Sequence, residues 1–356
     1  MSLRFATILM CAAVWAGSAS AQTWTPVEGD AAIGTLPMAR GPALAEARIH
    51  YRTLGEPRRG ADGKVNNAVL LLHGTGGTGA QFLSPQFADE LFGRGQPLDV
   101  TRYYVIMPDN LGHGASSKPS DGLRAAFPEY GYTEMVEAQR RMLAELGVEH
   151  LRLILGTSMG CMHIFVWGTT HPEAADALMP MACQPTRIVG RNRLWRTMVK
   201  DAIRSDPLWD GGNYQAQPVQ GLRTAVDLLL LAGSAPMAMQ QDLATAEAVD
   251  GYLTTQMERR LPALDANDLW SQVNASWDYD PSGGLQRMSA PTTWINSADD
   301  FINPPELGLS EAFIPQLPDA DFRLIPNSAD GKGHGTHTWA KFWKADLIAL
   351  LARTER

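Results

Sequence analysis

One five-residue motif, G-T-S-M-G at residues 156–160, constrains the fold more than any other feature of this chain. It directly follows the apolar run 151–155 and precedes a stretch with a helical pattern that begins at Cys161. Glycines on both sides of a serine permit a strained turn between a strand and a helix, because a side chain at either position would collide with neighbouring backbone. We therefore predict a strand, a tight turn and a helix, with Ser158 raised out of a sheet as a candidate nucleophile.

Short apolar runs typical of buried strands recur along the chain, and a helical pattern lies between two of them. The helix is indicated by an apolar face at Met135, Met142, Leu143 and Leu146, which Gly147 closes. Strands that alternate with helices predict a mostly parallel sheet. With 356 residues, of which 45% are hydrophobic, the chain can bury a full α/β core. The expected strands are 45–53, 67–73, 103–107, 151–155, 177–181, 292–295 and 322–325.

The alternation stops between residues 184 and 285, a stretch far longer than an ordinary crossover. We interpret 184–285 as a helical cap inserted into a core formed by 22–183 and 286–356. The cap is rich in large side chains, which could roof a substrate site or pack the cap onto the sheet; packing is the simpler interpretation for each one. These side chains are Trp195, Trp209, Tyr214, Met237, Met239 and Tyr252.

Residues 1–21 have the pattern of a signal peptide, with Arg4, the apolar run 5–15 and a small-residue site, Ala-Ser-Ala, before Gln22. The alternative is a short buried helix. The run is well short of the roughly 20 residues that a membrane-crossing helix needs, and no later segment sustains that length. We therefore expect a soluble mature protein, periplasmic or secreted, without a membrane span. A net charge of -8 also disfavours nucleic acid and anionic membranes as partners.

The mature chain would keep only Cys161 and Cys183, which could form a disulfide or remain two buried thiols. No cysteine and histidine cluster has the spacing of a zinc site. The segment 109–114 contains Asp and His but is better explained as a tight glycine loop, and Gly76-Gly77 lacks the lysine of a phosphate-binding loop. We expect neither a metal nor a dissociable cofactor.

A serine hydroxyl becomes a nucleophile when a base takes its proton, and that base needs a carboxylate to fix its tautomer. Two segments downstream of Ser158 supply these residues after apolar runs. Asp300 is the preferred acid, because it begins an acid, hydrophobic and proline turn, and Asp299 is its alternative. His334 is the preferred base, because it lies between glycines; His337 is the alternative, but we expect it to enter the final helix.

The negative charge that develops during acyl transfer needs two backbone N–H donors. We expect them from Met159, which follows the nucleophile, and from Thr75 in the glycine-rich turn 73–77. In this interpretation His73 is structural and does not act as a second base.

The chain resembles the α/β-hydrolase superfamily and, within it, the homoserine O-acetyltransferase-like family. The resemblance rests on residues 156–162, on the strand 104–108, and on the run D-P-L-W-D-G-G-N-Y at 206–214. It implies an α/β-hydrolase fold with a helical cap, the order Ser, Asp, His for the catalytic residues, an acyl-enzyme intermediate and a possible homodimer through the cap.

Two departures from the family pattern affect the expected reaction. The loop 110–117 looks like that of ordinary hydrolases, and a family arginine that grips a carboxylate falls on Lys200. Because export also separates the protein from cytoplasmic acyl thioesters, the sequence favours hydrolysis of a small-molecule acyl ester. The alternatives are an O-acyltransferase that uses a thioester donor and a non-catalytic binding module.

Overall fold

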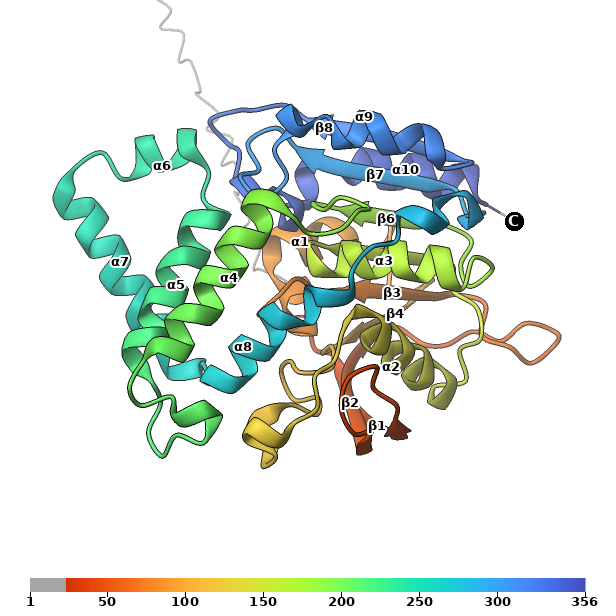
Figure 1. The fold of residues 1–356 in the computed structure, drawn as a ribbon. Helices are drawn as coiled ribbons and strands as arrows, with labels where there is room; N and C mark the ends of the chain where they lie inside the picture. The colour runs from red at the N-terminus through yellow and green to blue at the C-terminus, as the bar shows by residue number, and fades with distance from the viewer. Residues whose placement is uncertain (1–23, 356) are drawn as a thin grey trace, which may run out of the picture.

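The computed structural model describes residues 24–355, which form a sheet of eight strands flanked by helices (Figure 1). The predicted signal peptide, 1–21, lies outside these residues. The strand order is β1-β2-β4-β3-β5-β6-β7-β8; β1 and β2 run antiparallel to their neighbours, and β4, β3 and β5 to β8 are mutually parallel. The strands are β1 (Val27–Leu36), β2 (Leu44–Leu54), β3 (Ala68–Leu72), β4 (Tyr104–Pro108), β5 (Leu153–Thr157), β6 (Leu178–Met181), β7 (Thr292–Ser297) and β8 (Ala320–Ile325). The predicted mostly parallel sheet is confirmed.

Helices cover both faces of the sheet, which explains why β3 to β6 are continuous apolar runs. Alternate side chains of β3 enter different cores: Leu70 and Leu72 face one cluster, whereas Val69 and Leu71 face the other. The first cluster is closed by α2 (Tyr132–Glu145), α3 (Met159–Thr170) and α9 (Leu309–Phe313), and the second by α1 (Pro85–Leu91) and α10 (Lys344–Arg353).

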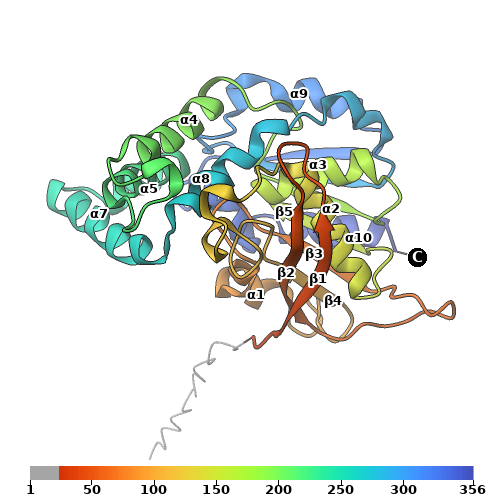
Figure 2. The ribbon, with the colours of Figure 1, turned by 60° about the horizontal axis from the view of Figure 1, so that its bottom comes forward.

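The sequence analysis did not anticipate β1. This strand, V-E-G-D-A-A-I-G-T-L, contains two glycines and two acids, and most of its side chains are exposed. It pairs with β2 at the edge of the sheet (Figure 2), where one buried face is sufficient. β1 is therefore stabilised by its hydrogen bonds to β2, and a local apolar pattern does not reveal such a partner.

Five α-helices, together with short 3-10 turns, connect β6 to β7 and lie to one side of the sheet (Figure 1). Their shared apolar cluster includes Trp195 and Tyr214, with Trp209 packed against it, so these three side chains pack the cap internally. The cluster ends at Val273, and Leu285 already belongs to the main core. Within residues 24–355 no single helix is long and apolar enough to cross a membrane; only α5 and α6 together, bent by 110°, pass that test. The cap helices are α4 (Gly190–Ser205), α5 (Val219–Gly233), α6 (Pro236–Asp242), α7 (Ala246–Arg260) and α8 (Ala266–Asn274).

The 206–214 run joins the cap helices to one another. The carboxylate of Asp206 accepts the N–H of Gly221 at 2.8 Å, near the start of α5. The hydroxyl of Tyr214 donates to Asp265 at 2.7 Å, at the residue that caps α8, and its ring stacks on Trp209. Residues 206–214 therefore connect α5 and α8 within the cap.

Candidate active site

The turn between β5 and α3 places Ser158 at the carboxyl end of the central strand. Ser158 has φ 55° and ψ −110°, a conformation that non-glycine residues rarely adopt. A Cβ on Gly156 would lie 2.3 Å from the carbonyl oxygen of Gly160, and one on Gly160 would lie 2.0 Å from that of Leu72. Both glycines are therefore required by the backbone, as the motif predicted.

The three residues chosen as nucleophile, base and acid form one chain of hydrogen bonds. Ser158 Oγ and His334 Nε2 are 2.7 Å apart, and His334 Nδ1 is 2.8 Å from Asp300 Oδ2. Asp300 is 1% exposed and the side chain of His334 is 13% exposed. Because Nδ1 faces a carboxylate, the imidazole holds its proton there and leaves Nε2 free to accept one from Ser158.

Asp299 does not contact His334 in this arrangement. Its Oδ2 accepts the N–H of Gly333 at 2.9 Å, so it fixes the start of the 3-10 helix η10 (Gly333–Thr338), which carries His334. The two neighbouring acids thus have different contacts. Asp300 faces the imidazole of His334, and Asp299 holds the backbone of the segment that carries His334. Sequence reasoning offered Asp299 only as a competitor.

His337 lies beside His334, with 5.2 Å between the ring centroids, and its buried Nδ1 has no hydrogen-bond partner within the described residues. It belongs to η10, and the final helix α10 begins only at Lys344, so the expectation that His337 enters that helix was wrong. The 3-10 helix η10, which contains Gly333 and Gly335, carries both His334 and His337. Burial and the nearby His334 lower the pKa of His337 to about 3, which keeps its ring neutral.

Asp300 is held by more than the histidine. Its Oδ1 accepts the N–H of Ile302 at 2.8 Å, and its Oδ2 accepts Nδ2 of Asn303 at 2.9 Å. Burial raises the pKa of Asp300, but His334 and these donors outweigh burial and leave the pKa below its usual value. The acid is therefore ionised and oriented. In the sequence, only its place in the same turn as Asp300 points to Asn303.

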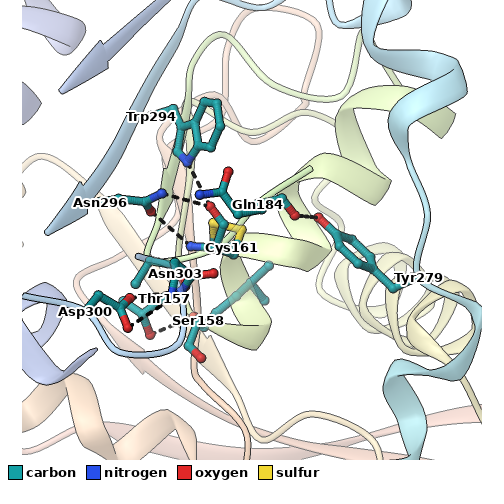
Figure 3. The surroundings of a disulfide bond; sticks show 12 residues. Thr157, Ser158, Cys161, Gln184, Tyr279, Trp294, Asn296, Asp300 and Asn303 are labelled. Carbon is teal, nitrogen blue, oxygen red and sulfur yellow. Dashed lines mark hydrogen bonds between the residues drawn. A yellow bond between two sulfur atoms is a disulfide. The ribbon is translucent and has the colours of Figure 1, made fainter. Parts of the chain in front are cut away.

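A disulfide between Cys161 and Cys183 braces the site from behind, which settles the alternative that the sequence left open (Figure 3). Cys161 lies in the first turn of α3, one turn after Ser158, and Cys183 follows β6. Asn303 Nδ2 also donates to the carbonyl of Ala182 at 3.0 Å. The nucleophile helix and the turn that carries the acid are thus both tied to residues 182–183.

The turn after β3 lies against the nucleophile. A Cβ on Gly74 would come within 3.2 Å of the Ser158 Cβ, so the backbone can approach only because this residue is a glycine. Gly77 donates to the carbonyl of Gly74 at 3.0 Å, which closes the turn that carries Thr75. Met159 begins α3, so its N–H is one of the donors that a helix leaves without an internal partner. Thr75 and Met159 therefore both lie in turns next to Ser158.

His73 and the 109–114 loop support this turn. His73 Nε2 accepts the N–H of Asn110 at 2.9 Å, and its Nδ1 donates to the carbonyl of Gly74 at 2.8 Å. Asp109 Oδ1 accepts the N–H of Gly79 at 2.8 Å and pairs with Arg52. Both ring nitrogens of His73 are therefore engaged in hydrogen bonds to the backbone, in agreement with the interpretation of His73 as structural.

Residues 67–330 match the family described as alpha/beta hydrolase fold. This match covers more than half of the chain and agrees with the sheet order and the Ser158 turn described above. The chain is an enzyme of the α/β-hydrolase superfamily.

Relatives found by sequence indicate which family within the α/β-hydrolase superfamily the chain belongs to. A homoserine O-acetyltransferase of Moorella thermoacetica is 30% identical over 303 residues, which are 74% of this chain and 79% of that protein. A homoserine O-succinyltransferase of Aromatoleum aromaticum is 32% identical over 290 residues, which are 71% of this chain and 76% of that protein. The chain belongs to the homoserine O-acetyltransferase-like family. These relatives agree better with the acyl-transfer alternative than with the hydrolysis that the sequence analysis favoured.

Solved structures of a homoserine O-acetyltransferase and of an ester hydrolase share this fold. A homoserine O-acetyltransferase from Bacillus anthracis aligns with a TM-score of 0.80 at 18% identity, covering 92% of this chain and 98% of that one. An acetylester hydrolase from Corynebacterium glutamicum aligns with a TM-score of 0.79 at 22% identity, covering 92% and 96%. At these identities the likeness concerns the fold alone.

Proposed function

We propose that the chain is an O-acyltransferase that works through an acyl-enzyme on Ser158. Its Oγ bonds to the acyl carbon while His334 Nε2 takes the hydroxyl proton, and the departing thiolate or alkoxide then receives that proton. An acceptor hydroxyl next attacks the acyl carbon and gives its proton to His334. The new ester leaves as Ser158 recovers the proton.

The observation that carries this proposal is the unbroken chain of hydrogen bonds from Ser158 through His334 to Asp300. Asp300 holds the imidazole tautomer, and the N–H groups of Thr75 and Met159 stabilise the oxyanion. The names of the curated relatives support transfer to a hydroxyl acceptor as the net reaction. No step of the proposal requires a metal or a dissociable cofactor.

Ester hydrolysis is the second candidate, and a specific observation favours it. Ser158 and Thr75 are half-buried and Gly76 is exposed, so water can approach the oxyanion turn. Lys200, which stands where the family arginine falls, donates to Asn274 at 3.0 Å, and an ammonium cannot provide a bidentate fork. Both features weaken the hold on an amino-acid acceptor and leave water as a competitor.

We also propose that the protein is exported by its first 21 residues and acts in the periplasm or outside the cell. The disulfide at the site supports this proposal, because such bonds persist in oxidising compartments. An exported enzyme would draw acyl groups from esters or secreted thioesters. Fractionation of expressing cells, followed by mass measurement of the mature N-terminus, tests this; a cytoplasmic chain that keeps residue 1 would refute it.

The reaction itself is tested by following the acyl group. The chain from Gln22 onward is given chromogenic esters with and without L-homoserine, and Ser158→Ala is the control. Transfer predicts acyl-homoserine as the main product and little free acid. Free acid released at a rate that homoserine does not change would establish hydrolysis and reject the first proposal. Turnover that survives Ser158→Ala would reject both.

A further inference from the structure

Gln272 connects the cap to two glycine-containing loops of the core. It lies on α8, which runs between the other cap helices and the core (Figure 1), and it is 8% exposed. Its Nε2 donates to the carbonyl of Gly112 at 2.8 Å. Its Oε1 lies over Gly76, 3.9 Å from the position that a Cβ would occupy there. One side chain of the cap therefore reaches both the loop at Gly112 and the turn 73–77.

The contact with Gly112 fixes which way the amide of Gln272 points. Gly112 is itself held in place, because its N–H donates to the carbonyl of Ser117 at 2.9 Å and its φ of 79° is one that glycine adopts readily. A carbonyl oxygen can only accept a hydrogen bond, so the amide nitrogen must face Gly112 and the amide oxygen must face Gly76. The oxygen of Gln272 is therefore directed at the turn 73–77.

This oxygen has no partner in the described part of the protein. Among residues 24–355 no donor forms a hydrogen bond with Gln272 Oε1. The oxygen is not one of the fully buried polar atoms, and Gly76 beside it is exposed, so a molecule can reach it from solvent. An amide that is held at its nitrogen and free at its oxygen is prepared to accept a hydrogen bond from a bound molecule.

The free oxygen lies close to the reacting groups. Gly74 contacts Ser158, since a Cβ on this glycine would come within 3.2 Å of the serine Cβ. Gly76 follows two residues later, and consecutive α-carbons are about 3.8 Å apart, so the two glycine α-carbons lie within about 8 Å of each other. The hydrogen bond from Gly77 to the carbonyl of Gly74 closes this turn. A substrate group a few bonds from the ester oxygen can therefore reach Gln272.

We propose that Gln272 is a specificity-determining residue, whose Oε1 accepts a hydrogen bond from a second hydroxyl of the alcohol that is acylated or released at Ser158. The amide is uncharged, so it suits a neutral hydroxyl, whereas an ammonium would favour a carboxylate. The substrate class is thus an ester of an alcohol that carries a second hydroxyl. This inference rests on the acyl chemistry proposed for Ser158. It applies to transfer and to hydrolysis, because the alcohol is the acceptor in one reaction and the leaving group in the other.

The test compares the turnover of esters that differ only in this donor. The acetates of ethylene glycol, 1,3-propanediol and 1,4-butanediol, each with one free hydroxyl, are paired with the same esters in which that hydroxyl is methylated. The value of kcat/KM is measured from the consumption of each ester, which counts hydrolysis and transfer alike. We expect the free hydroxyl to be preferred by about 3- to 10-fold for at least one chain length, as one neutral hydrogen bond allows.

Gln272→Met should remove this preference, because methionine has a similar length but only a weak acceptor. Gln272→Asn is shorter by one methylene, should reduce the preference as well, and serves in place of the first variant if that variant does not fold. Asn267→Leu is the matched control. Asn267 lies on the same helix and its Nδ2 also donates to a glycine carbonyl, that of Gly212 at 2.8 Å, but this bond lies within the cap. The control should keep the full preference.

Equal kcat/KM for the paired esters at every chain length in the wild-type protein would overturn this inference and leave the proposed function intact. A preference that persists in Gln272→Met, or a loss that Asn267→Leu shares, would also overturn it. If the folded wild-type protein consumes none of the esters and a fluorophosphonate probe does not label Ser158, the proposed function is rejected, and the inference with it.

Discussion

The Ser158 site and the surroundings of Arg196 in the cap hold buried charges in different ways. Around Ser158 the protein supplies the partners: Asp300 has two N–H donors besides His334 and Asn303. By contrast, the buried guanidinium of Arg196 in the cap has neutral neighbours: its Nε donates to Asn192 Oδ1 at 2.9 Å, and it lies over the ring of Trp195. The difference teaches that the carboxylate beside His334 is oriented by several fixed donors, whereas the buried cation of the cap is held by a neutral side chain and an aromatic ring.

Removing the acid should produce the largest loss. Asp300→Asn leaves His334 in the wrong tautomer, and we expect kcat to fall by about 10³–10⁴ with KM little changed. Steady-state kinetics on a chromogenic ester and the rate of fluorophosphonate labelling both measure this. Asp299→Asn is the matched control; because it only loosens the loop at Gly333, its loss should stay below about 10-fold. Equal losses in the two variants would contradict the assignment.

The disulfide contributes to the same preorganised region through stability. Cys161 and Cys183 are 22 residues apart, and a loop of that size is worth about 3 kcal/mol in the free energy of unfolding. Cys161→Ala together with Cys183→Ala should lower that free energy by about this amount in a denaturant titration. A thiol reductant should shift the wild-type curve in the same direction and leave the double variant unchanged. Overlapping curves for the oxidised and reduced wild type would show that the disulfide does not contribute to the free energy of unfolding.

Asn303 tests whether positioning of the acid matters by itself. Asn303→Ala removes one donor to the Asp300 carboxylate, and we expect kcat to fall about 10- to 100-fold at constant KM. Asn296→Ala is the comparison, because Asn296 holds the backbone of Cys183 and does not touch Asp300. It should lower stability with less effect on kcat. If both variants lose kcat equally, Asn303 has only a structural role.

The parts that the sequence predicted are those with local physical causes. The glycines at 156 and 160, the buried parallel strands and the order of Ser158, Asp300 and His334 all follow from steric or chemical requirements that few residue types meet. β1 was missed because its partner strand stabilises it, and the disulfide remained open because pairing depends on three-dimensional proximity. The burial of Arg196 could not be predicted either, since an arginine on an amphipathic helix is normally exposed.

The smallest expected effect concerns pH and the buried histidine beside Tyr132. His163 packs on the ring of Tyr132, and burial, followed by the charge of His73, lowers its pKa to about 3. Its usual pKa is about 6.5, so the unfolded chain takes up a proton between these values while the folded chain does not, and stability falls as the pH drops below about 6.5. Between pH 7 and 5.5 this histidine should account for about 1 kcal/mol of the loss in the free energy of unfolding. His163→Gln should lower stability at both pH values and make the loss between them smaller by that amount. If the variant keeps the full pH dependence, His163 is protonated in the folded protein and the core around Tyr132 is more polar than its contacts indicate.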